Sequence, residues 1–460
     1  MAFDPIAGVN GVGGLPLGKF LQIAFTSGVF NQLNRTFPDF EMVKKFRVGD
    51  PNWREQRFLL QTSLGPSAIQ YNNPGSLSST FPKAQRIGIS EKIAVSKELD
   101  ATVEIEYNLY KKALNSPLKY AEPLALEMQS KAIAAKRRIA ADLYGDGTGV
   151  VGTVASASVT GTRLSIVIDT ANAARGHVGF FEYGDLVIPR TAAGAAQLPT
   201  VTAGTVAALR VVSRSRKTNT VVLEAVDAND NLLEVSAVGD VSAGDLVYRA
   251  GQTDIPNLSI AVPDYGLISN VFAGYESLLA NDGRTVHGIQ MSGITAGTHV
   301  DCNAQLIALK YVQEALSEAK VAVGQGLYSW DMLVMSPEAR DSLVEADEDK
   351  RRLTVTDSKR VQGAKAFVFQ HENDTLEVVS SEYVKQKRAY ALPKQSAGQS
   401  AMMQLYFTEM APVDVGSGKL HLKPASGGGH ERRIASYMEG QIALLCTHPA
   451  AGIVVENFTI

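Results

Sequence analysis

The stretch DLYGDGTGVVG, residues 142–152, combines two aspartates with four glycines, a composition that could hold phosphate, bind calcium or end a helix. A Walker-type phosphate loop precedes its helix and ends in Gly-Lys-Ser/Thr, whereas this stretch follows a helical pattern and contains no lysine. An EF-hand loop needs acids at alternate positions and a closing glutamate, but after Asp142 and Asp146 the next acid is Asp169. We therefore expect a structural turn, with Gly145 as the left-handed cap of the preceding helix.

Cys446 and His448 are the closest approach in the sequence to a nucleophile and its base. Two residues apart on a strand, their side chains would point to the same face. A hydrolase would also need a third partner and an oxyanion-type turn, and the sequence shows neither of these, nor a G-x-S-x-G elbow. We expect a structural role for both residues and keep a hydrolase that uses them as an alternative.

The other reactive side chains do not form a recognisable site. None of the seven histidines belongs to an H-x-H or H-E-x-x-H pattern, and the two cysteines form no C-x-x-C pair. Glu104 and Glu106 alternate with apolar residues, which is typical of a solvated strand face and not of an acid–base pair. The sequence predicts no catalytic residue, cofactor or bound metal, and therefore a protein that acts through its surfaces.

The composition argues against several classes of protein. The 460 residues, 45% hydrophobic and 20% charged, are enough for two or three folded modules and are not typical of a disordered chain. With 44 basic and 47 acidic residues the net charge is -3, which argues against nucleic-acid binding through overall charge. There is no signal-peptide pattern and no apolar run of the roughly 20 residues that span a bilayer. Two cysteines indicate a reducing cytosol and not a disulfide scaffold.

The N-terminal part predicts an arm followed by a long hairpin. Residues 1–16 are rich in glycine and poor in charge, and the strand-like runs 54–64 and 84–96 flank a segment full of turn formers. At roughly 3.3 Å per residue such a hairpin would project on the order of 40–70 Å. An isolated two-stranded ribbon is marginal in water, so we expect it to lie on a neighbouring subunit. The candidate residues for this inter-subunit contact are Arg57, Phe58, Tyr71, Phe81, Lys83 and Arg86.

Two further regions differ sharply in pattern. From Pro123 to Tyr144 apolar residues recur every three or four positions, which predicts a helix about 33 Å long. Residues 154–252 instead predict short strands at intervals of roughly ten residues, typical of a small barrel or sandwich. Gly-Asp-Leu-Val occurs twice in this region, and we expect the same tight turn entering two strands of one barrel. Basic residues gather in one expected hairpin, where a solvated strand edge is favoured over nucleic-acid contact: Arg210, Arg214, Arg216 and Lys217.

The C-terminal half predicts mixed structure and then strands. We expect a helix that begins at Asp301 or Asn303 and runs to about Val323, and a second helix with Ser336 as its N-cap. Residues 394–460 are rich in strand-like runs, and the last of them is apolar. This indicates a docked C-terminal strand and not a free tail.

The order of these parts resembles the major capsid protein of tailed bacteriophages, the Hong Kong 97-like fold. LYGDGTG is similar to the turn that often closes the spine helix of that family, and HPAAGIVVENFTI is similar to its last strand region. The resemblance implies an α+β fold with an extended N-arm, an E-loop hairpin, a spine helix, axial and peripheral domains, and an inserted small β-barrel-like domain. The implied boundaries are 1–53 for the N-terminal arm, 54–105 for the E-loop, 106–153 for the peripheral domain with the spine helix, 154–252 for the inserted β-rich domain, 253–393 for the mixed α/β axial domain and 394–460 for the β-rich C-terminal part of the peripheral and axial domains.

The function implied by the resemblance is that of a shell. Copies of the chain would assemble into hexamers and pentamers of an icosahedral head, in the host bacterial cytoplasm, and the virion would enclose double-stranded DNA that the wall contacts weakly. A scaffold protein, a portal and a decoration protein are the implied partners, and no membrane is involved. Some members weld subunits through Lys–Asn isopeptide bonds; no asparagine and acid can be placed beside Lys83, so cross-linking is left open, with its absence favoured.

Three other functions are kept as alternatives. An encapsulin-type cellular shell shares the fold, but this chain is long for one and carries the inserted domain. A β-rich surface adhesin fits poorly with the absent signal peptide and the strong helix. The hydrolase that uses Cys446 and His448 is the enzyme alternative.

Overall fold

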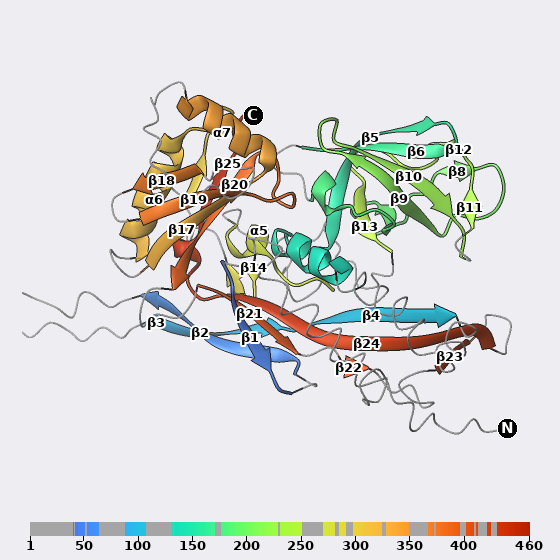
Figure 1. The fold of residues 1–460 in the computed structure, drawn as a ribbon, viewed down its shortest axis with the longest axis horizontal. Coiled ribbons are helices and arrows are strands. Elements are labelled where there is room, and N and C mark those ends of the chain that lie inside the picture. The colour runs from blue at the N-terminus through green and yellow to red at the C-terminus, as the bar shows by residue number, and fades with distance from the viewer. Residues whose placement is uncertain are drawn as a thin grey trace, which may run out of the picture.

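Three sheet systems surround a central helix in the computed structural model of this α+β chain. Figure 1 shows a mixed sheet and a barrel side by side, both on the same side of a third, elongated sheet, with helix 133–143 (teal) and α5 (Tyr275–Leu278) between them. The structure describes residues 40, 42–50, 53–63, 88–106, 131, 133–170, 176–228, 231–250, 270–280, 285–290, 298–323, 328–348, 367–371, 374–395, 402–408, 411–412, 421–424 and 430–460.

The central helix ends where the sequence indicates, but not by the expected cap. Residues 133–143 are helical, and the predicted N-terminal turns at 123–130 lie outside the described residues. The final bonds run from Tyr144 N to Ala141 O and from Gly145 N to Asp142 O, both 3.1 Å. Because these i→i−3 bonds tighten the last turn, Gly145 does not adopt a left-handed conformation, and its prediction as the cap was wrong. The chain reverses further on, at Gly147 and Gly149, with φ of +77° and +80°.

Residues 150–249 form a closed antiparallel barrel. Six strands follow one another around it in the order β10, β6, β5, β13, β7, β9, and the pairing of β9 with β10 closes the ring. Alternate residues fill the interior, as Leu164, Ile166 and Ile168 do from one strand. The strands are β5 (Val150–Thr160), β6 (Arg163–Ile168), β7 (Leu186–Arg190), β9 (Ala208–Ser215), β10 (Thr220–Val226) and β13 (Leu246–Arg249), with β8 (Thr200–Val201), β11 (Leu232–Leu233), β12 (Val235–Ala237) and the 3₁₀ turn η3 (Val178–Phe180) around them.

The two Gly-Asp-Leu-Val segments form the same turn, as predicted. Gly184 and Gly244 have φ of +86° and +92°, and each following aspartate accepts a bond from the backbone N–H three residues earlier. The strands that leave these turns, β7 and β13, pair with each other in the barrel. Only glycine adopts such φ values without strain, so the repeat reflects a backbone requirement and not a ligand site.

The mixed sheet contains six strands in the order β16, β25, β20, β17, β19, β18, with β16–β25 and β17–β19 parallel. Helix α6 packs against β16 and β25, and α7 packs against β19. The C-terminal strand β25 lies inside this sheet, which confirms that it is docked. The elements are β16 (His299–Asp301), α6 (Leu309–Val323), β17 (Tyr328–Met335), α7 (Pro337–Glu348), β18 (Phe367–His371), β19 (Asp374–Ser380), β20 (Arg388–Gln395), the 3₁₀ turn η4 (Pro449–Ala451) and β25 (Ile453–Glu456).

The predicted start of α7 is confirmed, whereas the predicted start of α6 is wrong. Ser336 is the N-cap of α7, since its Oγ accepts a 3.2 Å bond from Ala339 N. The predicted start of α6 at Asp301 or Asn303 was wrong, because α6 begins at Leu309. Asp301 Oδ1 accepts a 2.7 Å bond from Asn303 N, and Asn303 itself has a φ of +52°. These two residues therefore form a local turn at the end of β16 and not a helix N-terminus.

The third sheet, called the long-strand sheet below, is built on the 17-residue strand β24. Strand β4 pairs with one side of β24 over ten residues, and β21, β22 and β23 pair with it elsewhere, while β1 runs parallel to β21. Residues 97–106, which directly follow the predicted hairpin run 84–96, thus pair with β24 in this sheet. The strands are β1 (Lys44–Val48), β4 (Lys97–Glu106), β21 (Met403–Thr408), β22 (Ala411–Pro412), β23 (His421–Pro424) and β24 (His430–Cys446).

The predicted hairpin is present at its base. Strands β2 (Glu55–Ser63) and β3 (Gly88–Val95) pair antiparallel from Glu55↔Val95 to Ser63↔Gly88, and we call this pair the ribbon. Its tip, residues 64–87, lies outside the described residues. A second small hairpin, β14 (Thr285–Val286) with β15 (Ile289–Gln290), lies at the base of the ribbon.

Replacing either turn glycine of the barrel should weaken the barrel specifically. No atom lies within 4 Å of a Cβ built on Gly184 or Gly244, so the cost of alanine comes from the backbone alone and should be roughly 1–2 kcal/mol. Hydrogen exchange of β7 and β13 would measure it. Gly49→Ala is the matched control, since Gly49 is equally open and lacks a positive φ. Unchanged exchange in Gly184→Ala and Gly244→Ala would contradict the backbone explanation of the repeat.

Candidate inter-subunit surface and module junction

The base of the ribbon is anchored to its own subunit. The Phe58 ring meets the His287 ring edge-on, with centroids 6.4 Å apart, and Lys92 Nζ donates a 2.8 Å bond to Gly288 O. His287 and Gly288 are the two central residues of the β14–β15 turn, with φ of +51° and +71°. A two-residue turn of this kind is short and stiff, so it gives the ribbon a fixed base.

The predicted contact residues of the ribbon have different surroundings. Phe58 is half-buried and packs against the subunit's own core, whereas the neighbouring Leu59 is 67% exposed. The side chain of Arg57 is 61% exposed and forms ion pairs with Glu55 at 2.9 Å and with Glu91 at 3.6 Å. The other predicted contact residues lie outside the described part of the chain: Tyr71, Phe81, Lys83 and Arg86.

The outer face of the long-strand sheet is apolar at one end and acidic further along. Ala443 and Leu445 of β24 pack with Trp53 and Ala94, next to the ribbon base. Farther along the same face Glu439 lies directly opposite Asp100 in the β4–β24 register, and Gln441 lies opposite Glu98. Burial, followed by the charges of Glu98 and Asp100, raises the pKa of Glu439. Like charges placed directly opposite on paired strands are destabilising, so this face is not optimised for the isolated subunit.

Two arginines of the β9–β10 hairpin hold the barrel against the loops of the mixed sheet. Arg216 Nε and Nη2 each lie 3.0 Å from a carboxylate oxygen of Glu338 in α7, a two-pronged ion pair. Arg214 Nη2 lies 2.9 Å from Glu382 Oε2, and its Nη1 donates a 2.6 Å bond to Gly179 O. The side chains of Arg214 and Arg216 are only 23% and 19% exposed. Their prediction as a solvated strand edge was therefore wrong, because both guanidinium groups cross to another part of the fold.

Glu182 joins three parts of the structure. Its carboxylate lies 3.2 Å from Arg137 Nη1 of the central helix and 3.8 Å from Arg214 Nη2 of the barrel, and it accepts a 3.3 Å bond from Tyr383 OH of the mixed sheet's loop. Burial raises the pKa of Glu182, and the two arginines oppose this shift. The helix, the barrel and the mixed sheet therefore meet at one partly buried carboxylate.

The stretch after the central helix is structural, as the sequence indicates. Arg249 of the barrel is 7% exposed, and its guanidinium lies 3.3 Å from Asp142 Oδ1 and 3.2 Å from Asp185 Oδ2. Asp146 Oδ1 accepts a 2.9 Å bond from Thr148 N and another from the Thr148 hydroxyl. Asp142 and Asp146, the two aspartates of this stretch, thus fix the joint between the helix and the barrel.

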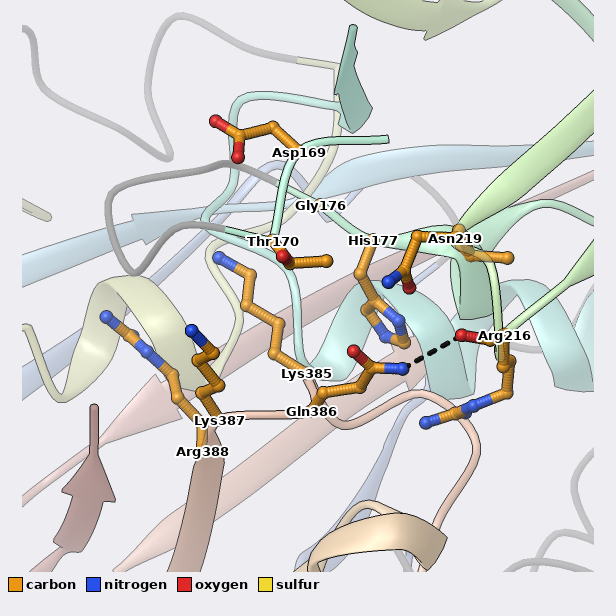
Figure 2. A pocket seen from close by; sticks show the side chains of 11 residues that line it. Asp169, Thr170, Gly176, His177, Arg216, Asn219, Lys385, Gln386, Lys387 and Arg388 are labelled. Atoms are coloured by element: carbon orange, nitrogen blue, oxygen red, sulfur yellow. Dashed lines mark hydrogen bonds between the residues drawn. The ribbon is translucent and has the colours of Figure 1, made fainter. Parts of the chain in front are cut away.

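A small pocket lies beside this junction, between the barrel and residues 385–388. Figure 2 shows His177 on the barrel side and the side chains of Lys385, Lys387 and Arg388 extending from one segment opposite. His177 Nδ1 accepts a 3.0 Å bond from Gly179 N, so Nε2 carries the proton that is donated to Tyr383 O at 2.6 Å. Burial, followed by the charge of Arg216, lowers the pKa of His177 to about 3. The imidazole is therefore neutral at physiological pH and acts as a structural donor.

The cations of the pocket are largely neutralised by carboxylates behind them. Glu276 of α5 is 7% exposed and lies 3.0 Å from Lys385 Nζ and 2.7 Å from Arg388 Nη1. Arg388 Nη2 also lies 2.6 Å from Glu456, which pairs with His299 Nδ1 at 3.0 Å. These contacts consume the positive charge that an anionic ligand would need, so the pocket belongs to the packing of the junction.

Cys446 and His448 do not form a nucleophile–base pair. Burial raises the pKa of Cys446 to about 12, which leaves the thiol protonated, and burial also lowers the pKa of His448. The imidazole of His448 instead lies 2.9 Å from Tyr328 OH through Nδ1. Cys302 is likewise buried, and burial raises its pKa to about 12. Neither thiol has the low pKa of a reactive cysteine.

The described residues form neither a metal site nor a membrane-spanning helix. Among the residues that the structure describes, no three His, Cys, Asp or Glu side chains converge as a metal site would require. None of the helices in the described ranges combines the length and apolar character needed to cross a bilayer.

The junction between the barrel and the mixed sheet could not be predicted from the sequence. The run of arginines in the β9–β10 hairpin was visible, but its partners Glu338 and Glu382 lie more than a hundred residues away. The sequence around Glu276 did not indicate its role, because the helix that contains it is only four residues long. The role of such a buried carboxylate becomes visible only when the positions of the surrounding cations in three dimensions are known.

Comparison with known proteins gave structural similarity without sequence similarity. No model of a known protein family matches the chain, and no curated protein matches it. Similar solved structures are the cyanophage A-1(L) capsid (9% identity, 92% of this chain and 93% of that chain, TM-score 0.43), a Mycobacterium phage Bobi structure (6%, 92% and 90%, 0.40) and an encapsulin complex from Synechococcus elongatus PCC 7942 (9%, 92% and 89%, 0.39). Phage capsids and encapsulin shells are the kinds of protein that the order of parts in the sequence resembles.

Removing the like-charge contact of the long-strand sheet should stabilise the unassembled chain. Glu439→Gln should raise the free energy of unfolding at neutral pH by roughly 0.2–1 kcal/mol. The raised pKa means that the folded chain binds this proton more tightly than the unfolded chain, so the penalty exists at neutral pH and disappears as the pH falls through that pKa. Denaturant unfolding at neutral and acid pH measures both effects, with Glu345→Gln on the exposed side of α7 as the control. A gain that persists unchanged at acid pH would contradict the charge explanation.

The two thiols should be inert in the folded protein. At pH 8 a thiol reagent such as DTNB should leave Cys302 and Cys446 unmodified, because both are buried and protonated. After unfolding, two thiols per chain should react. Rapid modification of Cys446 in the folded chain would instead support the hydrolase alternative.

Proposed function

We propose that this chain is the major capsid protein of a tailed double-stranded DNA bacteriophage, with a Hong Kong 97-like fold. In this proposal the ribbon is the E-loop, helix 133–143 is the C-terminal part of the spine helix, the long-strand sheet is the core of the peripheral domain and the mixed sheet is the axial domain. The barrel is the inserted domain. The protein would act in the virion as a structural subunit, without catalytic residues.

The observation that carries the proposal is the ribbon. It is fixed at one end by Phe58 and Lys92, and beyond this base it carries a 67% exposed Leu59. A two-stranded ribbon is marginal in water unless something covers it. A second copy of the chain supplies that cover when subunits are arranged head to tail in closed rings. Hexamers and pentamers of a shell are such rings.

The charge distribution fits a wall that contacts DNA weakly. The net charge of the chain is -3. Three arginines of the barrel region, Arg214, Arg216 and Arg249, are already committed to carboxylates of the same subunit. A wall with many free cations would bind the packaged phosphates along its length. The scaffold, portal and decoration proteins remain proposed partners on the strength of the resemblance alone.

Deleting the ribbon tip should prevent shell formation without unfolding the subunit. Removal of Gly65–Pro82 leaves a short loop between β2 and β3, and the contacts at the base of the ribbon are unaffected. We expect normal circular dichroism, no closed particles by electron microscopy and a small oligomer or monomer by sedimentation. A variant that replaces the same residues with a Gly/Ser linker of equal length separates the length of the tip from its sequence. Stable, normal shells from the deletion would refute the role of the ribbon.

The contents of particles from the natural source distinguish the two kinds of shell. Nuclease-protected double-stranded DNA inside the particles is the expected result. An enzyme cargo in place of DNA would favour an encapsulin-type compartment. A monomer at high concentration that binds a cell surface would favour the adhesin.

A further inference from the structure

The barrel is joined to the central helix by buried contacts and by the chain itself. Residues 144–149 lead directly from the helix into β5, and Arg249 of β13 reaches back to Asp142 in the last turn of the helix. Within the barrel, the Arg249 side chain is held by a 2.9 Å bond that it donates to Phe180 O. With the Arg249 side chain only 7% exposed, this joint is shielded from water and from salt.

The barrel is joined to the mixed sheet by a different kind of contact. In the described ranges no strand of the barrel pairs with a strand of the mixed sheet. The polar contacts involve side chains: the ion pairs Arg216–Glu338 and Arg214–Glu382, the bond from Arg216 to Glu382 O, the 3.0 Å bond from Gln386 Nε2 to Arg216 O, and the His177 bond to Tyr383 O. Glu338 and Glu382 are 34% and 40% exposed. Partly exposed ion pairs are weaker and more sensitive to salt than buried ones.

We propose that Arg214 and Arg216 form a releasable latch, which holds residues 381–387 and the start of α7 against the barrel and lets this segment move away when it opens. The ion pairs of the two joints differ in burial, and only the joint between barrel and helix is reinforced by the chain itself, so the latch is the weaker joint. One consequence rests on the proposed function: in a shell, opening of the latch would allow the subunit to change shape between assembly forms.

Hydrogen–deuterium exchange on the unassembled full-length chain tests the latch without reference to any shell. Arg216→Glu should speed exchange in residues 381–387 and at the start of α7 on the order of five- to tenfold, the effect of losing a partly buried ion pair. Protection of β5, β6 and β13 should not change, because these strands are held by the barrel itself. The double variant Arg216→Glu/Glu338→Arg should restore slow exchange.

Arg163→Glu is the matched control. Arg163 of β6 forms a 2.5 Å ion pair with Glu224 of β10, so both partners belong to the barrel. Its reversal should leave residues 381–387 unchanged. Should Arg216→Glu fail to fold, the wild-type chain answers the same question, because exchange in 381–387 should rise between about 0.05 and 0.5 M salt while the barrel strands stay protected.

Three results would overturn the latch. In the first, Arg216→Glu loosens the barrel strands together with residues 381–387. In the second, the swapped double variant exchanges as fast as the single variant. In the third, salt leaves 381–387 unaffected. A functional latch in a chain that never forms particles would leave the inference intact and reject the shell, so the two conclusions fail separately.

Discussion

The buried carboxylate of Glu276 is the contact on which the arrangement of the other parts depends. It lies in the short helix α5, is 7% exposed, and holds Lys385, Arg388 and the hydroxyl of Tyr390 within 2.7 to 3.3 Å. A buried charge without partners costs several kcal/mol, so α5 and the segment 385–390 can pack only in a register that brings these groups together. That register places Gln386 against the barrel and Arg388 at the start of β20. The latch, the pocket and the end of the mixed sheet all follow from it.

Close backbone packing enforces the same arrangement from the other side. A Cβ on Gly274 would lie 2.4 Å from Asp142 O and 2.5 Å from Gly145 O, so only glycine permits α5 to approach the end of the central helix. The rings of Tyr144, Tyr275 and Tyr390 then meet with centroids 5.2 to 6.2 Å apart. Such aromatic contacts add to burial alone. The helix, α5 and the mixed sheet therefore share one core, while the ion pairs of the barrel with the mixed sheet lie at its edge.

Local patterns in the sequence predicted local structure well. The strands of the barrel, the repeated turn, the helix to Leu143 and the N-cap Ser336 could all be read from residue types and spacing. Features set by distant residues could not be read. Asp301 was assigned to a helix start because its bond to Asn457, 156 residues away, cannot be seen in the sequence. Distant partners also explain why Arg216 was assigned to solvent and why the pairing of β4 with β24 was not predicted. For the candidate surface, the sequence identified the ribbon but not that Phe58 serves its own core.

The position of β25 has a consequence for the order in which the protein folds on the ribosome. This strand, Ile453–Glu456, lies between β16 and β20 in the mixed sheet. All residues of the barrel lie within one continuous segment, 150–249, so the barrel can close while the rest of the chain is still being made. The mixed sheet cannot be completed until residue 456 has left the exit tunnel. During synthesis the position between β16 and β20 therefore stays empty until β25 arrives, so the mixed sheet is completed after the barrel.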